Sequence, residues 1–384
     1  MTSSPRLSVV CDERFREYDF GPGHPFSERS RELAVRLLET VFPPGDRGPV
    51  EWLRSVPPAE RASLERFHRP EYLAHVEAAS VARETVLLDA GDTPAFPGCY
   101  EASARIVGGA DRGLGTTLEA GRPAFHPAGG LHHAHPDRAS GFCIFNDVAV
   151  AVARAVGEHR KVAYLDIDAH HGDGVMYGFY ESGRVLDIDF HQDGRTLFPG
   201  TGFPTECGRR DGAGLKVNVP LPPGAGDGAL RPLFHRIVPP LLRSFRPDVI
   251  VVQHGVDGHV GDALARLQYT PAAYADVDRT VLALAGELTG GRLLVTGGGG
   301  YRAESVSRVL ARAGTILAQS DVPDDAATLP ARWRDEYRTA LGATAPRTWG
   351  EHPRPAPSPW RREDEEKLVG VLESELGVQL PRPS

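Results

Sequence analysis

Short apolar runs alternate with longer amphipathic stretches through most of the 384-residue chain. Each run is rich in Val, Ile or Leu and stops at a polar residue or a glycine, which is typical of buried parallel strands. The predicted strands are Leu7–Cys11, Val162–Ile167, Val185–Phe190, Val249–Gln253 and Leu293–Thr296. The predicted helices are Arg29–Thr40, Tyr100–Leu118, Asp147–Glu158, Ala229–Ser244, Ala273–Leu288 and Ser305–Gln319. This alternation predicts an α/β domain with a central, mostly parallel sheet and helices on both faces.

The pattern changes from about Asp321, where proline and arginine become frequent. An amphipathic stretch, Glu363–Leu376, follows, and its apolar residues recur at helical spacing. We therefore predict one large domain over residues 1–320 and a peripheral helical extension, residues 321–384, packed on it.

Composition excludes several classes of protein. The net charge of −8 gives no general attraction to nucleic acid or to an anionic membrane. No run of 18 apolar residues predicts a membrane-spanning helix, and the first residues do not have the pattern of a secretory signal. The four cysteines are isolated, which favours free thiols in a reducing compartment. We expect a cytoplasmic protein with no nucleic-acid or membrane partner; the sequence assigns no oligomeric state.

The densest polar cluster directly follows the predicted strand Val162–Ile167. Asp166, Asp168 and His170 are two residues apart, so they share one face of an extended chain. Ligands of parallel α/β sheets bind beyond the carboxyl ends of the strands, and carboxylates and imidazoles are common metal ligands. The alternative is a solvated turn, but three acids, two histidines and two glycines within residues 166–174 favour a metal site.

Three further clusters carry groups of the same kind. His132 and His133 lie in a glycine-flanked loop, Asp257 follows the strand Val249–Gln253, and Tyr301 closes a four-glycine loop after the last strand. Four glycines allow close approach of the backbone to a ligand, but no Lys-Ser/Thr pair follows, so a nucleotide-binding loop is not indicated.

Together the four clusters fit a catalytic zinc centre, which needs three protein ligands and an open position. Asp168, His170 and Asp257 would supply the ligands. An imidazole suits the general base, and Asp166 and Asp173 are available to fix the tautomers of the paired histidines. A tyrosine hydroxyl such as that of Tyr301 can stabilise developing negative charge.

The chain resembles the arginase-fold histone deacetylase superfamily, and within it the bacterial acetoin-utilisation-type deacetylases, over roughly residues 8–318. The resemblance rests on seven motifs in the family's order: GPGHPF (21–26), GGLHHA (129–134), SGFCIFND (140–147), DIDAHHGDGV (166–175), FPGTG (198–202), QHGVDGH (253–259) and GGGGY (297–301). It implies the arginase/deacetylase fold and hydrolysis of an acetylated amine.

The resemblance also implies roles for individual residues. Asp168, His170 and Asp257 would hold the zinc ion. His133, backed by Asp173, would be the general base and then the acid. His132, backed by Asp166, would be its electrostatic partner, and Tyr301 would bond the scissile carbonyl and then the oxyanion.

Further residues are implied for substrate and for a second ion. The acyl-lysine tunnel would be formed by Gly141, Phe142, Phe198 and Gly299, with Leu264 and Asp92 at its rim. A potassium ion would lie near Asp166, with backbone carbonyls at Asp168, His170 and Phe190. An internal-channel arginine is expected after His24 and Pro25, at Arg29 or Arg31.

Two departures from the family pattern are visible. An alanine, Ala263, stands where the family often has proline between Asp262 and Leu264. Asp189 stands where a small residue is common near the potassium ion, and its added carboxylate should favour the cation.

Two rival functions are weighed against the deacetylase. A binuclear manganese ureohydrolase would need a second acid after Asp257, but the sequence there is Asp-Gly-His, ending at His259. An inactive reader of acyl-lysine would be expected to lose Tyr301 or a ligand, and all are present. The substrate stays open between an acetylated peptide and a small acetylated amine. An acetylpolyamine or a longer acyl chain is the alternative, and the short stretch 83–98 shows no channel-narrowing insert.

Overall fold

The structure, a computed structural model, describes residues 4–45, 48–82, 86–89 and 91–381. One sheet runs through it in the order β2-β1-β3-β8-β7-β4-β5-β6, and neighbouring strands pair in parallel. The strands are β1 Leu7–Val10, β2 Val50–Leu53, β3 Ala124–His126, β4 Val162–Asp166, β5 Val185–Gln192, β6 Lys216–Leu221, β7 Val249–Gln253 and β8 Leu293–Thr296. The parallel α/β sheet predicted from the sequence is confirmed.

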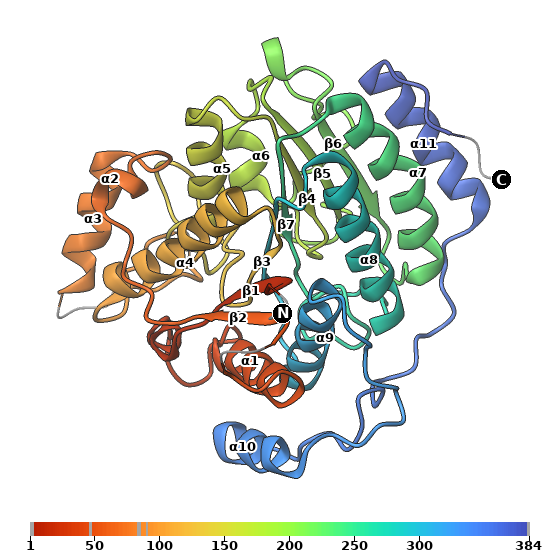
Figure 1. Ribbon diagram of the computed structural model, residues 1–384. Helices are drawn as coiled ribbons and strands as arrows, with labels where there is room; N and C mark the ends of the chain where they lie inside the picture. Colours follow the sequence, from red (N-terminus) through yellow and green to blue (C-terminus); the bar gives the residue numbers. More distant parts are fainter. Residues whose placement is uncertain (1–3, 46–47, 83–85, 90, 382–384) are drawn as a thin grey trace.

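Helices cover both faces of the sheet (Figure 1). One layer contains α1 Arg29–Val41, α7 Asp227–Phe245, α8 Pro271–Leu288 and α9 Ala303–Leu317. The other contains α4 Cys99–Ala120 and α5 Asp147–Gly157, with α2 Arg61–Leu64, α3 Pro70–Ser80 and α6 Asp173–Gly178 beside them. The six helices predicted in this part of the chain are present, whereas α2, α3 and α6 were not predicted. The sheet is therefore buried from both sides, as its apolar strands require.

Three strands were not predicted, for two physical reasons. β2 and β3 are only four and three residues long, too short to show a periodic pattern. β6 alternates Lys216 and Asn218 with valines, yet both polar side chains are buried. Pro220 is tolerated in β6 because this strand lies at the edge of the sheet.

The strand order brings the four polar clusters of the sequence together. The paired histidines follow β3, the glycine-rich loop follows β8, Asp257 follows β7, and Asp168 follows β4. These strands are consecutive neighbours in the sheet, β3-β8-β7-β4, and all are parallel. Their carboxyl ends therefore meet at a single edge, where a ligand is expected in this kind of sheet.

The C-terminal extension wraps around the outside of the helix layer (Figure 1). It contains α10 Ala331–Leu341, which packs on α1 and buries Trp333, and α11 Arg362–Leu376, which lies beside α7. The predicted helix in Glu363–Leu376 is thus confirmed, whereas α10 was not predicted. Between the two helices, residues 348–360, here called the C-terminal strap, run over the body of the protein.

The C-terminal strap contacts α9 and the segment between β7 and α8. Arg308 Nη1 donates to the carbonyls of Thr348 and Trp349, at 3.0 and 3.3 Å. The Ala356 amide donates to Gln268 Oε1, 2.5 Å away. Gln268 lies in the segment between β7 and α8, which also contains Asp257. The strap therefore braces this segment from outside.

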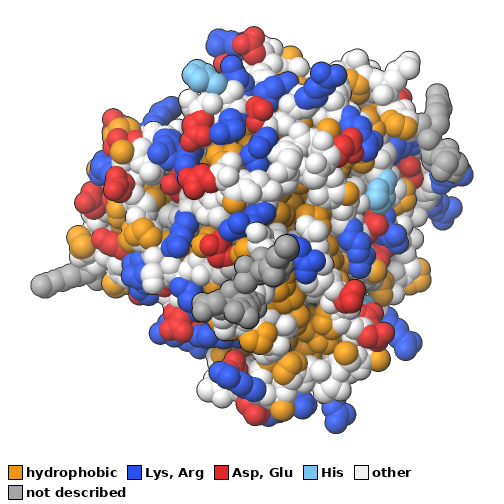
Figure 2. Space-filling view, viewed as in Figure 1, with side chains coloured by type: hydrophobic (Ala, Val, Ile, Leu, Met, Phe, Trp, Pro, Cys, Tyr) orange, Lys and Arg blue, Asp and Glu red, His pale blue; other side chains and the backbone are white. Residues whose placement is uncertain are grey.

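The surface seen in Figure 2 carries basic and acidic side chains interspersed, without a large patch of one sign. Many of them form ion pairs, such as Arg243 with Glu287 at 2.8 Å. Among the described residues, no helix is long and apolar enough to cross a membrane.

Candidate active site

Two carboxylates and one imidazole converge at the shared strand edge. One ligand atom each from Asp168, His170 and Asp257 lies within 4.8 Å of the others, and all three side chains are buried. His170 Nδ1 is 2.8 Å from Asp257 Oδ2 and 3.2 Å from Asp168 Oδ1. The structure thus brings together the three residues predicted to hold a metal.

Backbone amides and one glutamine hold these carboxylates in place. Asp168 Oδ2 accepts from the Gly299 amide at 2.7 Å and from Gln253 Nε2 at 3.0 Å. Asp257 Oδ1 accepts from the Ala169 amide at 2.7 Å. A Cβ atom on Gly299 would stand 2.0 Å from Asp257 Oδ2, so only glycine fits there. Gly299, expected at the substrate, therefore lies against the metal-site carboxylates, and Gln253 is a supporting residue to which the sequence analysis gave no role.

The protonation states of Asp168, His170 and Asp257 depend on one another. Burial and the charge of Asp168 raise the pKa of Asp257 to about 8. Burial opposes a charge on His170, but Asp257 and Asp168 prevail and raise its pKa to about 10. A metal ion would take the place of that histidine proton, because ligands must be deprotonated to bind.

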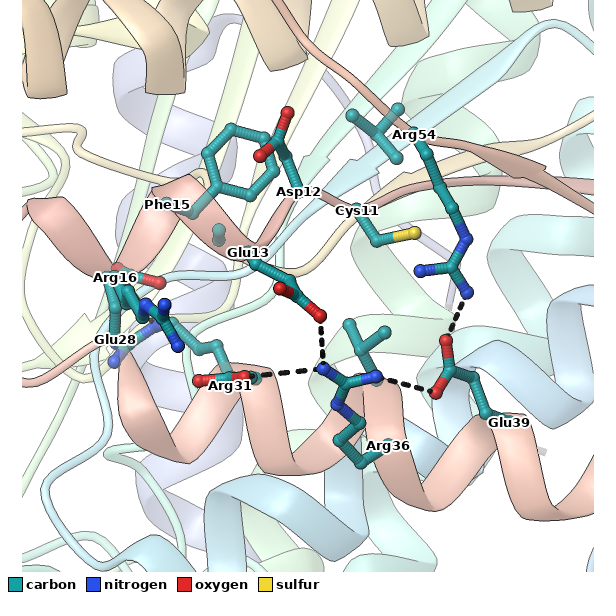
Figure 3. Close-up of a pocket in the computed structure, with 14 residues that line it drawn as sticks. Cys11, Asp12, Glu13, Phe15, Arg16, Glu28, Arg31, Arg36, Glu39 and Arg54 are labelled. Carbon is teal, nitrogen blue, oxygen red and sulfur yellow. Dashed lines mark hydrogen bonds and ion pairs between the residues drawn. The ribbon is translucent and has the colours of Figure 1, made fainter. Parts of the chain in front are cut away.

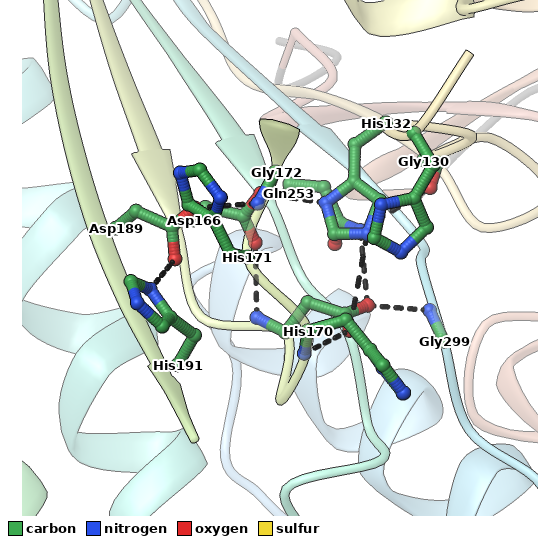
Figure 4. A network of polar contacts seen from close by, with 12 residues as sticks. Gly130, His132, Asp166, His170, His171, Gly172, Asp189, His191, Gln253 and Gly299 are labelled. Atoms are coloured by element: carbon green, nitrogen blue, oxygen red, sulfur yellow. Dashed lines mark hydrogen bonds and ion pairs between the residues drawn. The ribbon is translucent and has the colours of Figure 1, made fainter. Parts of the chain in front are cut away.

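The paired histidines each lie beside a carboxylate, and Figure 4 draws one of these pairs, His132 with Asp166. His132 Nδ1 lies 2.8 Å from Asp166 Oδ2, and His133 Nδ1 lies 2.7 Å from Asp173 Oδ1. The two Nε2 atoms are 3.1 Å apart and share one hydrogen bond. Both rings therefore present Nε2 toward the same point beside the metal centre.

The environments of the two rings push their proton affinities apart. Burial alone would lower the pKa of His132, but Asp166 and Asp168 outweigh it and raise this pKa to about 10. Burial and the neighbouring His132 lower the pKa of His133 to about 4, against the opposing pull of Asp173. One ring is thus cationic and the other neutral near pH 7, a division typical of acid and base roles.

Tyr301 enters the site from the glycine-rich loop. Its amide donates to Asp262 Oδ2 at 2.9 Å, and its ring centre is 6.3 Å from that of His170. Burial and the nearby Asp257 raise the pKa of Tyr301 well above its ordinary value. The hydroxyl therefore keeps its proton and remains a hydrogen-bond donor.

A cavity of about 20 Å³ lies among these groups. The residues that line it include Phe26, Leu131 and Cys143, together with the histidine pair, Asp168, His170 and Tyr301. Gly141 also lines it, and a Cβ atom there would stand 2.6 Å from the His133 ring and 2.9 Å from Phe198. Close packing around Gly141 thus shapes the approach to the two histidines.

Aromatic rings flank the entry. The Phe198 ring is 5.1 Å from that of His133, and the Phe142 ring is 6.1 Å from that of Tyr301. Phe198 and Leu264 are 45% and 39% exposed. These exposed fractions put both at the surface, where the sequence analysis expected the tunnel wall and its rim.

Asp92, predicted to be the rim acid, lies beside Thr93, which contacts the backbone of Phe142. Thr93 Oγ1 accepts from the Phe142 amide at 3.0 Å and donates to Asp89 Oδ2, with Asp92 Oδ1 3.4 Å away. Burial and Asp89 raise the pKa of Asp92 to about 6. Residues 83–85 and 90 of the predicted insert-free stretch lie outside the described residues.

Arg31 is the arginine that reaches the interior. It is 1% exposed, and its Nη2 donates to the Gly298 carbonyl at the cavity, whereas Arg29 reaches the Ala340 carbonyl at the surface. A second cavity, of about 40 Å³, lies on the other side of Arg31 and is lined by Glu28 (Figure 3). Burial raises the pKa of Glu28 to about 8.

Asp166 and Asp189, expected near a potassium ion, already have several partners. Asp166 Oδ1 accepts from the Asp168 amide at 3.0 Å, and its Oδ2 bonds His132. Asp189 Oδ1 bonds His191 Nδ1 at 2.7 Å, and its Oδ2 accepts from the Gly172 amide at 2.7 Å. Any ion here would therefore depend largely on backbone carbonyls.

His259, the residue at the position of a second acid, turns away from the metal centre. Its Nδ1 lies 2.9 Å from the Val260 carbonyl, and its ring stacks on Tyr274. Among the described residues, the group of side chains able to hold a metal contains Asp168, His170 and Asp257 only. This arrangement disfavours a binuclear centre.

Comparison with known proteins agrees with this geometry. The family model described as the histone deacetylase domain matches residues 24–317. The chain belongs to the histone deacetylase family. It is 34% identical to the acetoin utilization protein AcuC of Staphylococcus xylosus over 350 residues, covering 87% of this chain and 88% of the relative. It is 33% identical to AcuC of Bacillus subtilis (strain 168) over 357 residues, covering 89% of each chain.

A solved structure has the same fold. The crystal structure of the HDA15 HD domain superposes with a TM-score of 0.72 at 28% identity, over 82% of this chain and 91% of that one. Membership of the family and these relatives support a deacetylase that acts on an acetylated substrate. The matched region ends at residue 317, before α10 and α11.

Proposed function

We propose that this protein is a zinc-dependent deacetylase that hydrolyses the amide of acetyl-lysine or of a related small acetylated amine. The observation that carries the proposal is the convergence of Asp168, His170 and Asp257 within 4.8 Å, beside two histidines that differ in charge. A metal hydrolase needs both parts: ligands with an open position, and a base within reach.

The donor set fits a zinc ion. Two carboxylates and one imidazole are borderline-to-hard ligands, and three protein ligands leave a fourth position for substrate or water. The Gly299 and Gln253 donors orient Asp168, as supporting groups do in metal sites. When bound, the ion would supply Lewis acidity to the amide carbonyl and to a water molecule.

The residues of the chain divide the proton transfers between them. Neutral His133 takes a proton from the attacking water through Nε2, because its Nδ1 is held by Asp173. Cationic His132 stabilises the negative charge that develops. The protonated hydroxyl of Tyr301 donates to the carbonyl oxygen as it becomes an oxyanion. His133 then returns its proton to the leaving amine, which completes the hydrolysis.

The size of the cavity favours a short acyl group. A cavity of about 20 Å³ holds roughly one water-sized group, which suits a methyl group better than a longer chain. Leu131 and Cys143 close the cavity on the apolar side. We therefore place acetyl ahead of longer acyl groups in the proposed substrate range. In this proposal the second cavity, beside Arg31, would take the acetate product.

The substrate side of the proposal uses the exposed rings and the rim acid. Phe142 and Phe198 would flank the aliphatic stem of the acylated side chain, with Leu264 at the rim. Asp92 would accept hydrogen bonds from the substrate's backbone. A potassium ion near Asp166 and a cytoplasmic location, consistent with the free cysteines of the described chain, complete the proposal.

A substrate panel tests the proposed function. Purified protein with stoichiometric zinc is assayed for kcat/KM on acetyl-lysine peptides, acetylpolyamines and longer acyl-lysines. We expect the acetylated amines to be the best substrates. Tyr301→Phe should lower kcat by about 10²-fold, the usual effect of removing an oxyanion donor. No turnover of any acylated amine, or an unchanged kcat in Tyr301→Phe, would refute the assignment.

A further inference from the structure

Asp173 is bonded to two histidines, and the mechanism above uses only one of them. Its Oδ1 lies 2.7 Å from His133 Nδ1, and its Oδ2 lies 3.0 Å from His135 Nε2. His135 is only 6% exposed. Both oxygens of the carboxylate that supports the proposed base are therefore bonded to imidazole rings.

The sequence places the two rings on one side of the loop. His133 and His135 are separated by one residue, so they share a face where the chain is extended. The loop is fixed at this point, because the His135 amide donates to the Arg138 carbonyl at 2.9 Å and the His135 carbonyl bonds His68 Nδ1 at 3.1 Å. The His135 ring also lies nearly parallel to Tyr177, at 17°.

Two hydrogen bonds, one to each oxygen, fix the orientation of the Asp173 carboxylate. A carboxylate bonded through a single oxygen can rotate about the bond to its Cβ, so the direction of that hydrogen bond is not fixed. With Oδ2 held by His135, Oδ1 stays directed at His133 Nδ1. Burial opposes the charge on Asp173, but hydrogen bonds from His133 and His135 hold the pKa of its carboxyl well below the ordinary range. The group therefore stays an anion that accepts from both rings.

His135 does not take part in the proposed chemistry directly. The described residues that line the cavity include His132 and His133 but not His135. Its link to the proposed base, His133, runs through Asp173. An effect of His135 on turnover must therefore pass through the carboxylate.

We infer that His135 is a positioning residue: it locks Asp173 through Oδ2 so that the tautomer and orientation of His133 stay fixed for proton transfer. The inference rests on the proposed function, because it presupposes that His133 is the base. Outer partners of this kind typically contribute 10- to 100-fold to activity.

Two substitutions separate the hydrogen bond from the packing. His135→Gln can place its amide nitrogen where Nε2 lies and keep a donor for Asp173, whereas His135→Leu fills similar space without a donor. We expect kcat to fall about 10-fold or more in His135→Leu, with KM within about twofold, and to recover in His135→Gln. A wild-type kcat in His135→Leu, or an equal loss in both variants, overturns the inference.

A remote pair of the same kind provides the control. His235 Nε2 lies 2.8 Å from Asp276 Oδ2 on the helices α7 and α8, and neither residue lines the cavity. His235→Leu should leave kcat and KM unchanged. A fall equal to that of His135→Leu would show that loss of any such pair explains the result, and would overturn the positioning role.

Double substitution tests the path. If His135 acts through Asp173, adding His135→Leu to Asp173→Asn should change kcat little beyond the loss in Asp173→Asn alone. Multiplied losses overturn the inference.

A measurement without turnover separates this inference from the proposed function. In protein labelled with ¹⁵N at histidine, we expect a proton on His135 Nε2 at neutral pH, with a signal that is absent in His135→Gln and shifts in Asp173→Asn. An unprotonated Nε2 overturns the inference whatever the activity. Absence of turnover with the expected signal instead counts against the deacetylase proposal, and leaves the contact between His135 and Asp173 in place.

Discussion

Replacement of Gly141 by alanine would place one methyl group at the wall beside the proposed base. The backbone of Gly141 has φ +53°, a left-handed conformation that costs an L-residue about 1–2 kcal/mol. The new Cβ would stand 2.6 Å from His133 Cδ2 and 2.9 Å from Phe198 Cε1. The variant therefore perturbs both the backbone and the ring that is proposed to move the proton.

The size of the catalytic effect follows from these distances. Carbon atoms pack best at about 3.5–4.0 Å, so the His133 ring must retreat by about 0.9 Å and Phe198 by about 0.6 Å. Phe198 is 45% exposed and can yield, but His133 is held by Asp173 and His132. A displacement of about 1 Å at a catalytic group can cost about 10²-fold. We expect kcat to fall 10- to 100-fold and the free energy of unfolding to fall by about 1–2 kcal/mol.

The assay combines steady-state turnover with urea unfolding and metal analysis. Gly286→Ala is the matched control, because Gly286 lies inside α8 with nothing within 4 Å of an added Cβ. That variant should keep its kcat and gain about 0.5–1 kcal/mol of stability. A Gly141→Ala enzyme with wild-type kcat and bound zinc would refute the claim that His133 is confined by this wall.

Three further predictions concern the metal, the tyrosine loop and a buried acid. Asp257→Ala should lose stoichiometric zinc in metal analysis of the purified protein, and one tightly held zinc per chain would disprove the ligand assignment. Asp262 accepts from the Leu264 and Tyr301 amides with different oxygens, at 2.9 Å each, so Asp262→Asn leaves one amide facing a donor. It should lower kcat about 10-fold, but add little to Tyr301→Phe in a double-mutant cycle. Glu28 has a folded pKa of about 8 against an ordinary 4.5, so its contribution to stability is full below pH 4.5 and is lost as pH rises through 8. Glu28→Gln should therefore gain stability over the wild type by about 1.4 kcal/mol per pH unit between pH 5 and 8, and a pH-independent difference in urea unfolding would contradict the burial of this acid.

The main strands could be predicted from the sequence because they are apolar and buried on both faces. β4, β7 and β8 could be predicted to within about one residue, and their carboxyl ends carry the candidate ligands. β3 could not, because three residues show no period. Its absence from the prediction left the paired histidines in an unplaced loop, although they sit at the end of a central strand like the other clusters.

The supporting residues were harder to predict than the groups they support. Gln253, Asp262 and His135 all lie within or next to recognised motifs, yet their roles depend on which atoms they face. His135 belongs to the histidine-rich run from His132 to His135, but the spacing gives no indication that it shares a carboxylate with His133. Similarly, Asp262 was noted only for the residue that follows it. Such contacts join parts of the chain that are distant in sequence, so local patterns do not predict them.

The C-terminal strap gives the site an order of completion. A chain emerges from the ribosome from its N-terminus, and earlier parts generally begin to fold first. The strands β4 and β7, with Asp168 and Asp257 at their ends, are made well before residues 348–360. The strap contact at Gln268 can form only after residue 356 has been synthesised. The nascent protein could therefore bring the predicted ligands Asp168 and Asp257 together while the segment at Gln268 still lacks its outer brace, which makes this brace a late step.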